Sequence, residues 1–117
     1  MFEEIFVYRI EDPNTGYGPY HSNLNKELRE KLCSAHSSGE EYRPNGAADF
    51  SSNIDNCRFA ILTLEKLKEW FGEFFIQLLD SGFILTKYHV KNYLIGKSHF
   101  GQVMFNAQTA IKINEID

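Results

Sequence analysis

The segment Arg58 to Val90, "RFAILTLEKLKEWFGEFFIQLLDSGFILTKYHV", holds three consecutive elements of a folded domain. Arg58 to Leu62 is a short apolar run typical of a strand, and Phe83 to Val90 is a second such run. Between them, Thr63 is a residue type that caps the start of helices, and Gly82 is one that ends them. The segment therefore predicts a strand, a helix and a strand in succession.

The helix in this segment is defined by one apolar stripe. Its apolar residues recur at spacings of three and four, which places them on one face; they are Leu64, Leu67, Phe71, Phe74, Phe75 and Leu78. Glu65 in the first turn favours the start of the helix. We therefore expect a single amphipathic helix between Thr63 and Gly82.

The two ends of the chain add strands on either side of this unit. Glu4 to Ile10 is apolar on both faces of a strand, as in the centre of a sheet. After a polar connection through Ser98, Gln102 to Asn106 is a short strand, and the tail "AIKINEID" either adds an edge strand or frays. Because the last strands can pair as a hairpin, we expect an α+β fold with a mixed or antiparallel sheet.

A second main helix is predicted over Leu24 to His36, with Ser22 or Asn23 as its cap. From Ser37 to Asn56 the chain is rich in Ser, Gly, Asn and acidic residues. A loop of about 20 residues inside a compact domain is usually functional, so we interpret 37–56 as a lid or binding loop. The whole chain, 1–117, is expected to form one domain.

Composition limits the function. The chain has 117 residues, a net charge of −4 and a pI of about 5.5, which argues against direct binding to a nucleic-acid backbone. Its apolar runs are too short for a membrane span, and two cysteines make no disulfide framework. We therefore expect a cytoplasmic protein, with surplus aromatic residues (15%) available for a ligand or partner.

A metal site is not predicted. Cys33 and His36 are spaced by three residues in the predicted helix, but a structural zinc site normally needs two such pairs. We interpret Cys33 as a packing residue and His36 as a solvated helix end.

Arg9 is the most informative candidate. It alternates with Ile5 and Val7 on the first strand, where a charge needs a partner. One interpretation is an internal salt bridge; the other is an anion-binding arginine at the base of a cleft. In the second, Tyr17 and Tyr20 of the following loop stack on a planar ligand and His21 hydrogen-bonds beside it.

Two further polar residues are candidates. Gln102 opens a short strand after Gly101, and Thr63 stands at a helix start. A solvent-facing side chain for Gln102 and a simple cap for Thr63 are the alternatives without function.

The segments "VYRIEDPNTGYGPYHS", "LTLEKLKEWF", "LLDSGFILTKYHV" and "GQVMF" resemble small bacteriophage accessory proteins over about two thirds of the chain. This resemblance implies a protein that acts inside an infected bacterium, in the host cytoplasm.

The arrangement is also similar to the ADP-ribosyltransferase-like fold. That similarity implies that Arg9, on an early strand, holds the phosphate or ribose of NAD. Thr63 would match the Ser/Thr segment of this fold, where a later strand runs into a helix, and Gln102 would match the Glu or Gln that opens a late strand near the reacting ribose. Thr63 and Gln102 would then be the catalytic residues, and NAD the cofactor.

Two functions follow. The first is an NAD-like nucleotide cleft with ADP-ribosyltransferase-like activity. The alternative is a non-catalytic inhibitor that binds a host protein, such as a defence factor or a nucleic-acid enzyme; a structural virion component is a third, weaker option.

Overall fold

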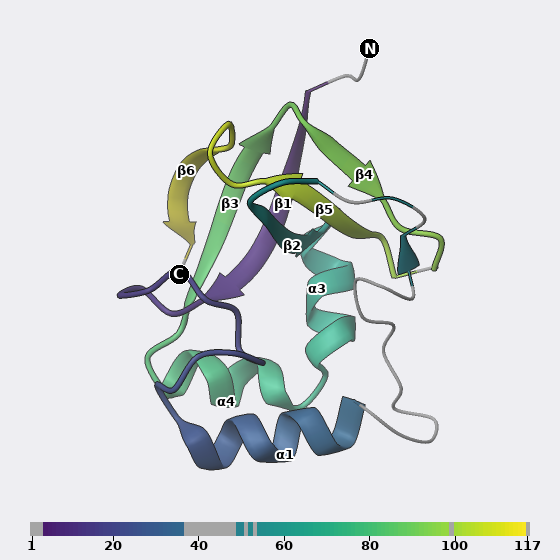
Figure 1. The fold of residues 1–117 in the computed structure, drawn as a ribbon. Helices are drawn as coiled ribbons and strands as arrows, with labels where there is room; N and C mark the ends of the chain where they lie inside the picture. The colour runs from purple at the N-terminus through teal and green to yellow at the C-terminus, as the bar shows by residue number, and fades with distance from the viewer. Residues whose placement is uncertain (1–3, 37–48, 51, 53, 99, 117) are drawn as a thin grey trace.

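The computed structural model describes residues 4–36, 49–50, 52, 54–98 and 100–116. They form one six-stranded antiparallel sheet and three helices (Figure 1). The strands are β1 (Ile5–Glu11), β2 (Cys57–Ile61), β3 (Ile84–Val90), β4 (Tyr93–Ile95), β5 (Gln102–Asn106) and β6 (Ile111–Ile116). The helices are α1 (Lys26–His36), α3 (Leu64–Phe71) and α4 (Phe74–Asp80). The predicted α+β class and antiparallel sheet are confirmed.

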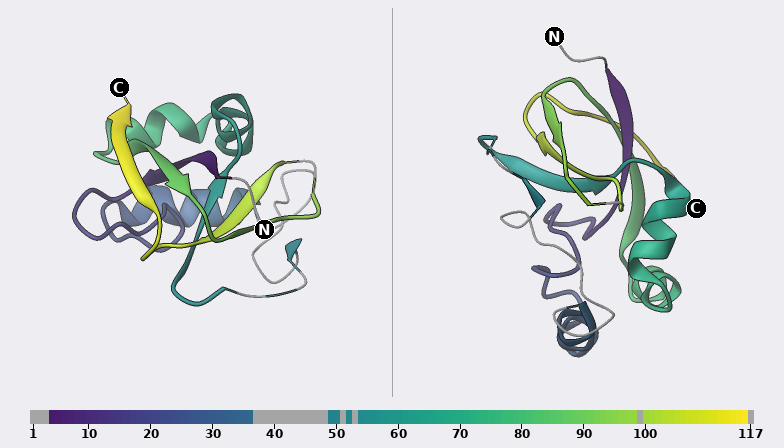
Figure 2. Two further views of the ribbon diagram at one scale, coloured as in Figure 1. Left: turned by 90° about the horizontal axis from the view of Figure 1, so that it is seen from above. Right: turned by 90° about the vertical axis from the view of Figure 1, so that its right-hand side faces the viewer.

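The sheet is strongly curled, and its connections require this. The strand order is β4-β5-β2-β1-β3-β6, so β3 and β4 stand four positions apart. In a flat sheet that separation would be about 19 Å, at about 4.8 Å per strand. Only Lys91 and Asn92 join the two strands, and the chain from Val90 to Tyr93 spans at most about 11 Å. The sheet must therefore bend towards closure, as Figure 2 shows.

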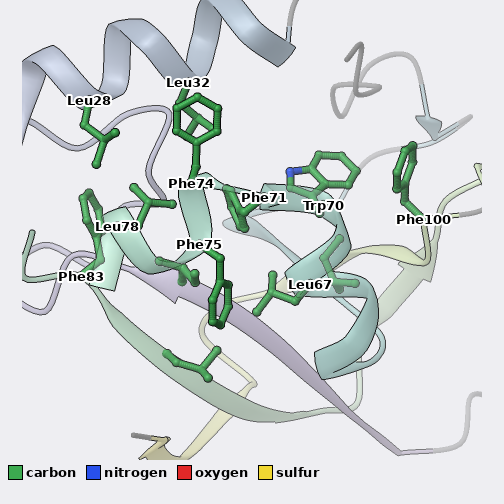
Figure 3. Close-up of a cluster of buried hydrophobic side chains, with 13 residues drawn as sticks. Leu28, Leu32, Leu67, Trp70, Phe71, Phe74, Phe75, Leu78, Phe83 and Phe100 are labelled. Carbon is green, nitrogen blue, oxygen red and sulfur yellow. The ribbon is translucent and has the colours of Figure 1, made fainter. Parts of the chain in front are cut away.

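The two faces of the curled sheet bury separate cores. The helix face carries Tyr8 and Ile10 of β1 beneath α1, α3 and α4, and a cluster rich in phenylalanine fills this layer (Figure 3). The opposite face, here called the inner face, carries Val7 and Arg9. Its apolar residues are buried although the helices cover the other side; they are Val7, Ala60, Tyr88, Val90, Tyr93, Val103 and Phe105. The curl of the sheet encloses them.

The predicted single long helix is wrong. Gly72 adopts φ +54 and ends α3, where its N–H donates to the carbonyl of Lys68. A second helix, α4, begins two residues later at Phe74. The apolar stripe continues across the break, since Phe71, Phe74 and Phe75 are all buried. The stripe therefore predicted the buried face but not the interruption.

Other observed elements also differ from the predicted ones. β4 lies within the segment predicted as a connection, while the predicted edge strand at the tail is confirmed as β6. Asn25 Oδ1 accepts the N–H of Leu28 at 3.0 Å and so caps α1, in place of Ser22 or Asn23.

Most of the predicted 37–56 loop, at 37–48, 51 and 53, lies outside the described residues. Among the residues that are described, no helix is long and apolar enough to cross a membrane.

Candidate functional site

Arg9 lies on the inner face with an exposed fraction of 6%. Its Nε donates to Oε1 of Glu11 at 2.9 Å, its Nη1 to the carbonyl of Phe59 at 2.6 Å and its Nη2 to the carbonyl of Gly16 at 2.7 Å. All three guanidinium nitrogens therefore have an internal acceptor. The internal salt bridge, one of the two interpretations of the sequence, is present.

The position of Arg9 explains these bonds. β1 pairs with β3 along its length but with β2 in a single register pair, Tyr8 with Ile61. We call this place the β1–β2 junction. Beyond the pair, the bond from Arg9 to the carbonyl of Phe59 joins β1 to β2 in place of a backbone ladder. A side chain thus supplies part of the hydrogen bonding between the two halves of the sheet.

The carboxylate of Glu11 collects three donors. Besides Arg9, the hydroxyl of Tyr88 donates to Oε1 at 2.8 Å, and Nζ of Lys112 donates to Oε2 at 3.1 Å. Burial lowers the pKa of Arg9, and the charge of Glu11 opposes that shift. Burial and the Glu11 carboxylate raise the pKa of Tyr88 to about 12, so its hydroxyl stays a proton donor at neutral pH. We call Arg9, Glu11, Tyr88 and Lys112 the inner-face cluster.

The loop after β1 is fixed by its own turn. The carboxylate of Asp12 accepts the N–H of Asn14 at 2.8 Å and the hydroxyl of Ser22 at 2.8 Å. These hydrogen bonds lower the pKa of Asp12. Tyr17 and His21, two of the predicted ligand-binding residues, are exposed on this loop. The loop is therefore ordered by hydrogen bonds within the protein, with two of its rings in solvent.

Tyr20 lies in a different place, against the helices. Its hydroxyl is 2.5 Å from Nδ1 of His36 and accepts the indole N–H of Trp70 at 2.8 Å, and its ring stacks on Phe71. His36 is buried, so its prediction as a solvated helix end is wrong. Cys33, predicted to pack, is exposed. The burial of the two residues is the reverse of the prediction, because the side of α1 that carries His36 faces the core and the side that carries Cys33 does not.

Thr63 and Gln102 occupy two further settings. Thr63 is exposed, and its Oγ1 accepts the N–H of Lys66 at 3.1 Å, which confirms the cap. Gln102 is buried, contrary to the solvent-facing interpretation, and its amide donates to Oδ2 of Asp49 at 2.9 Å. The Asp49 carboxylate also accepts the N–H and the hydroxyl of Ser98. Sequence reasoning missed Asp49, because no local pattern marked a buried carboxylate beside Phe50.

Thr63 and Gln102 are brought near each other, since Ile61 pairs with Gln102 and the N–H of Leu62 donates to the carbonyl of Gly101. The other predicted site residues have different described contacts. Arg9 belongs to the inner-face cluster, Tyr20 to the core under the helices, and Gln102 to the group around Asp49. No group of three or more metal-ligating side chains that could hold an ion occurs within the described part of the chain.

An exposed surface lies at the end of the sheet away from the helices (Figure 1). On the helix face, Phe6 pairs with His89 and His89 pairs with Ile111 across neighbouring strands. Phe6 is 48% and Ile111 52% exposed, and Nζ of Lys87 lies 4.5 Å from the centre of the Phe6 ring. Beside them, Glu4 forms an ion pair with Lys91, and its Oε2 lies 3.6 Å from Nε2 of His89. We call these residues the sheet patch.

The whole chain, residues 1–117, matches the family model described as bacteriophage T4 Y00F protein. The chain belongs to this family. The predicted resemblance to small phage proteins is thereby confirmed, and membership in the Y00F family extends it over the full length. A search of curated proteins and a search of solved structures each gave no match, so the similarity to the ADP-ribosyltransferase-like fold stays a prediction.

Proposed function

We propose that this phage protein acts without catalysis, by binding a host protein in the host cytoplasm, such as a defence factor or a nucleic-acid enzyme. The observation that carries the proposal is the engagement of Arg9, whose three nitrogens all donate to internal acceptors. An arginine held in this way supports the sheet and has little left to offer a substrate.

The sheet patch is the surface we propose for this contact. An aromatic ring and an isoleucine side chain, each about half exposed, lie together on a rigid sheet and are bordered by charged groups. Interfaces commonly combine a central aromatic anchor with a polar rim. Phe6 would be the anchor, and Glu4, Lys87 and Lys91 would form part of the rim.

The test is affinity capture from a bacterial lysate with the tagged protein. Wild type is expected to retain a specific host protein, and Phe6→Ser combined with Ile111→Ser is expected to lose it. Ile76→Ser is the matched control, because Ile76 is 61% exposed on α4, outside the patch. Equal capture by all three proteins, or no capture by wild type, would contradict the proposal.

The nucleotide cleft is the second candidate, and the proximity of Tyr17 to the Arg9-bound Gly16 supports it. In this case NAD would lie against the exposed side chains of Tyr17 and His21, on the loop whose Gly16 carbonyl accepts from Arg9. A thermal-shift screen with NAD and ADP-ribose tests it, since a ligand that binds the folded state raises its melting temperature. No shift at millimolar ligand would leave binding to a host protein as the sole proposal.

A further inference from the structure

We propose that a phosphate-type dianion binds beside the inner-face cluster, with the partly exposed Arg58 and Lys112 as its cationic contacts. This site is separate from the sheet patch. Arg58 and Lys112 belong to the inner face. Arg58 stands two residues before Ala60 on β2, so the two side chains share a face, and Lys112 pairs with Tyr88 of the inner face. Phe6 and Ile111 belong to the helix face.

The charges around Glu11 do not balance. Among the side chains that the structure describes, Arg9, Arg58 and Lys112 contribute three positive charges against the carboxylate of Glu11, and Tyr88 stays neutral at pH 7. The sum over these described groups is 3 − 1, or +2, in a protein whose net charge is −4. A surplus of this sign and size is the complement of a dianion.

Arg58 is the cation of this group without a described side-chain partner. Within the described residues, its guanidinium forms no hydrogen bond or ion pair, although its side chain is partly buried. Its charge acts on Arg9, adding to the effect of burial in lowering the pKa of that guanidinium. Arg9 is paired with Glu11, whereas Arg58 has no described carboxylate partner, so an anion bound beside Arg58 would offset the repulsion that remains between the two guanidinium groups.

Packing against the loop holds Arg58 in place. A Cβ built on Gly16 would lie 2.8 Å from Nη2 and 2.9 Å from Nη1 of Arg58, so the guanidinium occupies the space that a side chain would need. Gly16 also has φ +77, which favours glycine. The same residue gives its carbonyl to Arg9. Gly16 therefore links the two arginines and fixes the orientation of the one without a partner.

Lys112 supplies the second contact. Its side chain is 39% exposed, and its described hydrogen bond goes to Glu11, from an ammonium group that has three donors. A phosphate monoester carries about −1.5 to −2 charges at pH 7 and offers three acceptor oxygens. A guanidinium can bind two of these oxygens side by side, and an ammonium can bind the third. The ligand class is thus a terminal phosphate, free or attached to a nucleoside.

The test is an NMR titration of the ¹⁵N-labelled protein with inorganic phosphate, with AMP and with adenosine. Phosphate and AMP are expected to shift the amide signals of Gly16 and Gly18 with Kd in the millimolar range or tighter, and adenosine is expected to leave them unchanged. Tighter binding of AMP than of phosphate would identify a nucleotide as the source of the phosphate, whereas equal binding would identify the phosphate group alone.

Two variants make the result decisive. Arg58→Gln removes no described internal hydrogen bond, so the variant is expected to fold and to weaken phosphate binding at least tenfold. Lys26→Gln, which removes one exposed positive charge on α1, is the control and is expected to bind like wild type. Absence of shifts in wild type, or equal shifts in Arg58→Gln, would overturn the site. Neither result depends on the sheet patch, so this proposal and that of host-protein binding can fail separately.

Discussion

Replacing Arg9 by methionine tests whether the inner-face cluster serves the fold. The substitution leaves the Glu11 carboxylate buried with Tyr88 and Lys112 as its remaining donors. It also removes the donors of two carbonyl groups, those of Phe59 and Gly16.

The size of the effect follows from these losses. Removing one partner of a buried ion pair costs about 3–5 kcal/mol, and the lower end applies here because Glu11 keeps two donors. Each carbonyl that loses its donor adds about 1 kcal/mol, since both can recover part of the loss from water. The expected decrease in the free energy of unfolding is therefore about 5 kcal/mol, close to the whole stability of many small domains.

Urea unfolding, followed by circular dichroism and by the fluorescence of Trp70, measures this change. Arg29→Met is the matched control, because the side-chain hydrogen bond that the structure describes for Arg29 is an exposed one to Asn23, and a change within about 0.5 kcal/mol is expected. The double variant of Arg9→Met and Glu11→Gln should be more stable than the sum of the single effects predicts, by about 2 kcal/mol. A cost below about 1 kcal/mol for Arg9→Met, or strict additivity, would refute a structural role for the cluster and favour a ligand-binding one.

Three further predictions concern other parts of the chain. Gly96→Ala should destabilise the protein by more than about 2 kcal/mol in urea unfolding, because the new Cβ would overlap the Asp49 carboxylate; a neutral result would contradict the packing described there. Trp70→Phe should cost about 1–2 kcal/mol, because the Tyr20 hydroxyl loses its donor, and an unchanged melting temperature would count against that bond. Because hydrogen bonds lower the folded-state pKa of Asp12, its contribution to stability is present above about pH 4 and is lost as the pH falls through the folded value. Asp12→Asn should flatten this acid limb, and an unchanged pH profile between about pH 2 and 5 would show that Asp12 does not cause it.

The sequence predicted the strands better than the helices. Each predicted strand lies within one residue of its observed bounds, because short apolar runs between turn residues locate strands well. The break at Gly72 was missed because the apolar stripe keeps its spacing on both sides of it. β4 was missed because three residues are too few to show a periodicity.

Part of the inner-face cluster could be predicted from the sequence. A charge on a buried strand predicted that Arg9 needs an acceptor, and Glu11 lies on the same face two residues later. Ending the predicted strand at Ile10 hid this partner. Tyr88 and Lys112, which complete the cluster, come from strands more than 70 residues away in the chain, and no local pattern can place them beside Arg9.

The single register pair at the β1–β2 junction has a consequence for the order of opening. One side of the junction holds β1, β3 and β6, and the other holds β2, β5 and β4. Since one guanidinium and one backbone pair are the described hydrogen-bonded links between β1 and β2, rotation of a single side chain removes much of the hydrogen bonding across this line, and apolar packing remains. In hydrogen exchange we expect the amides of β2 nearest Phe59 to lose protection before those shared by β1 and β3, so that the molecule separates along this line into two three-stranded halves.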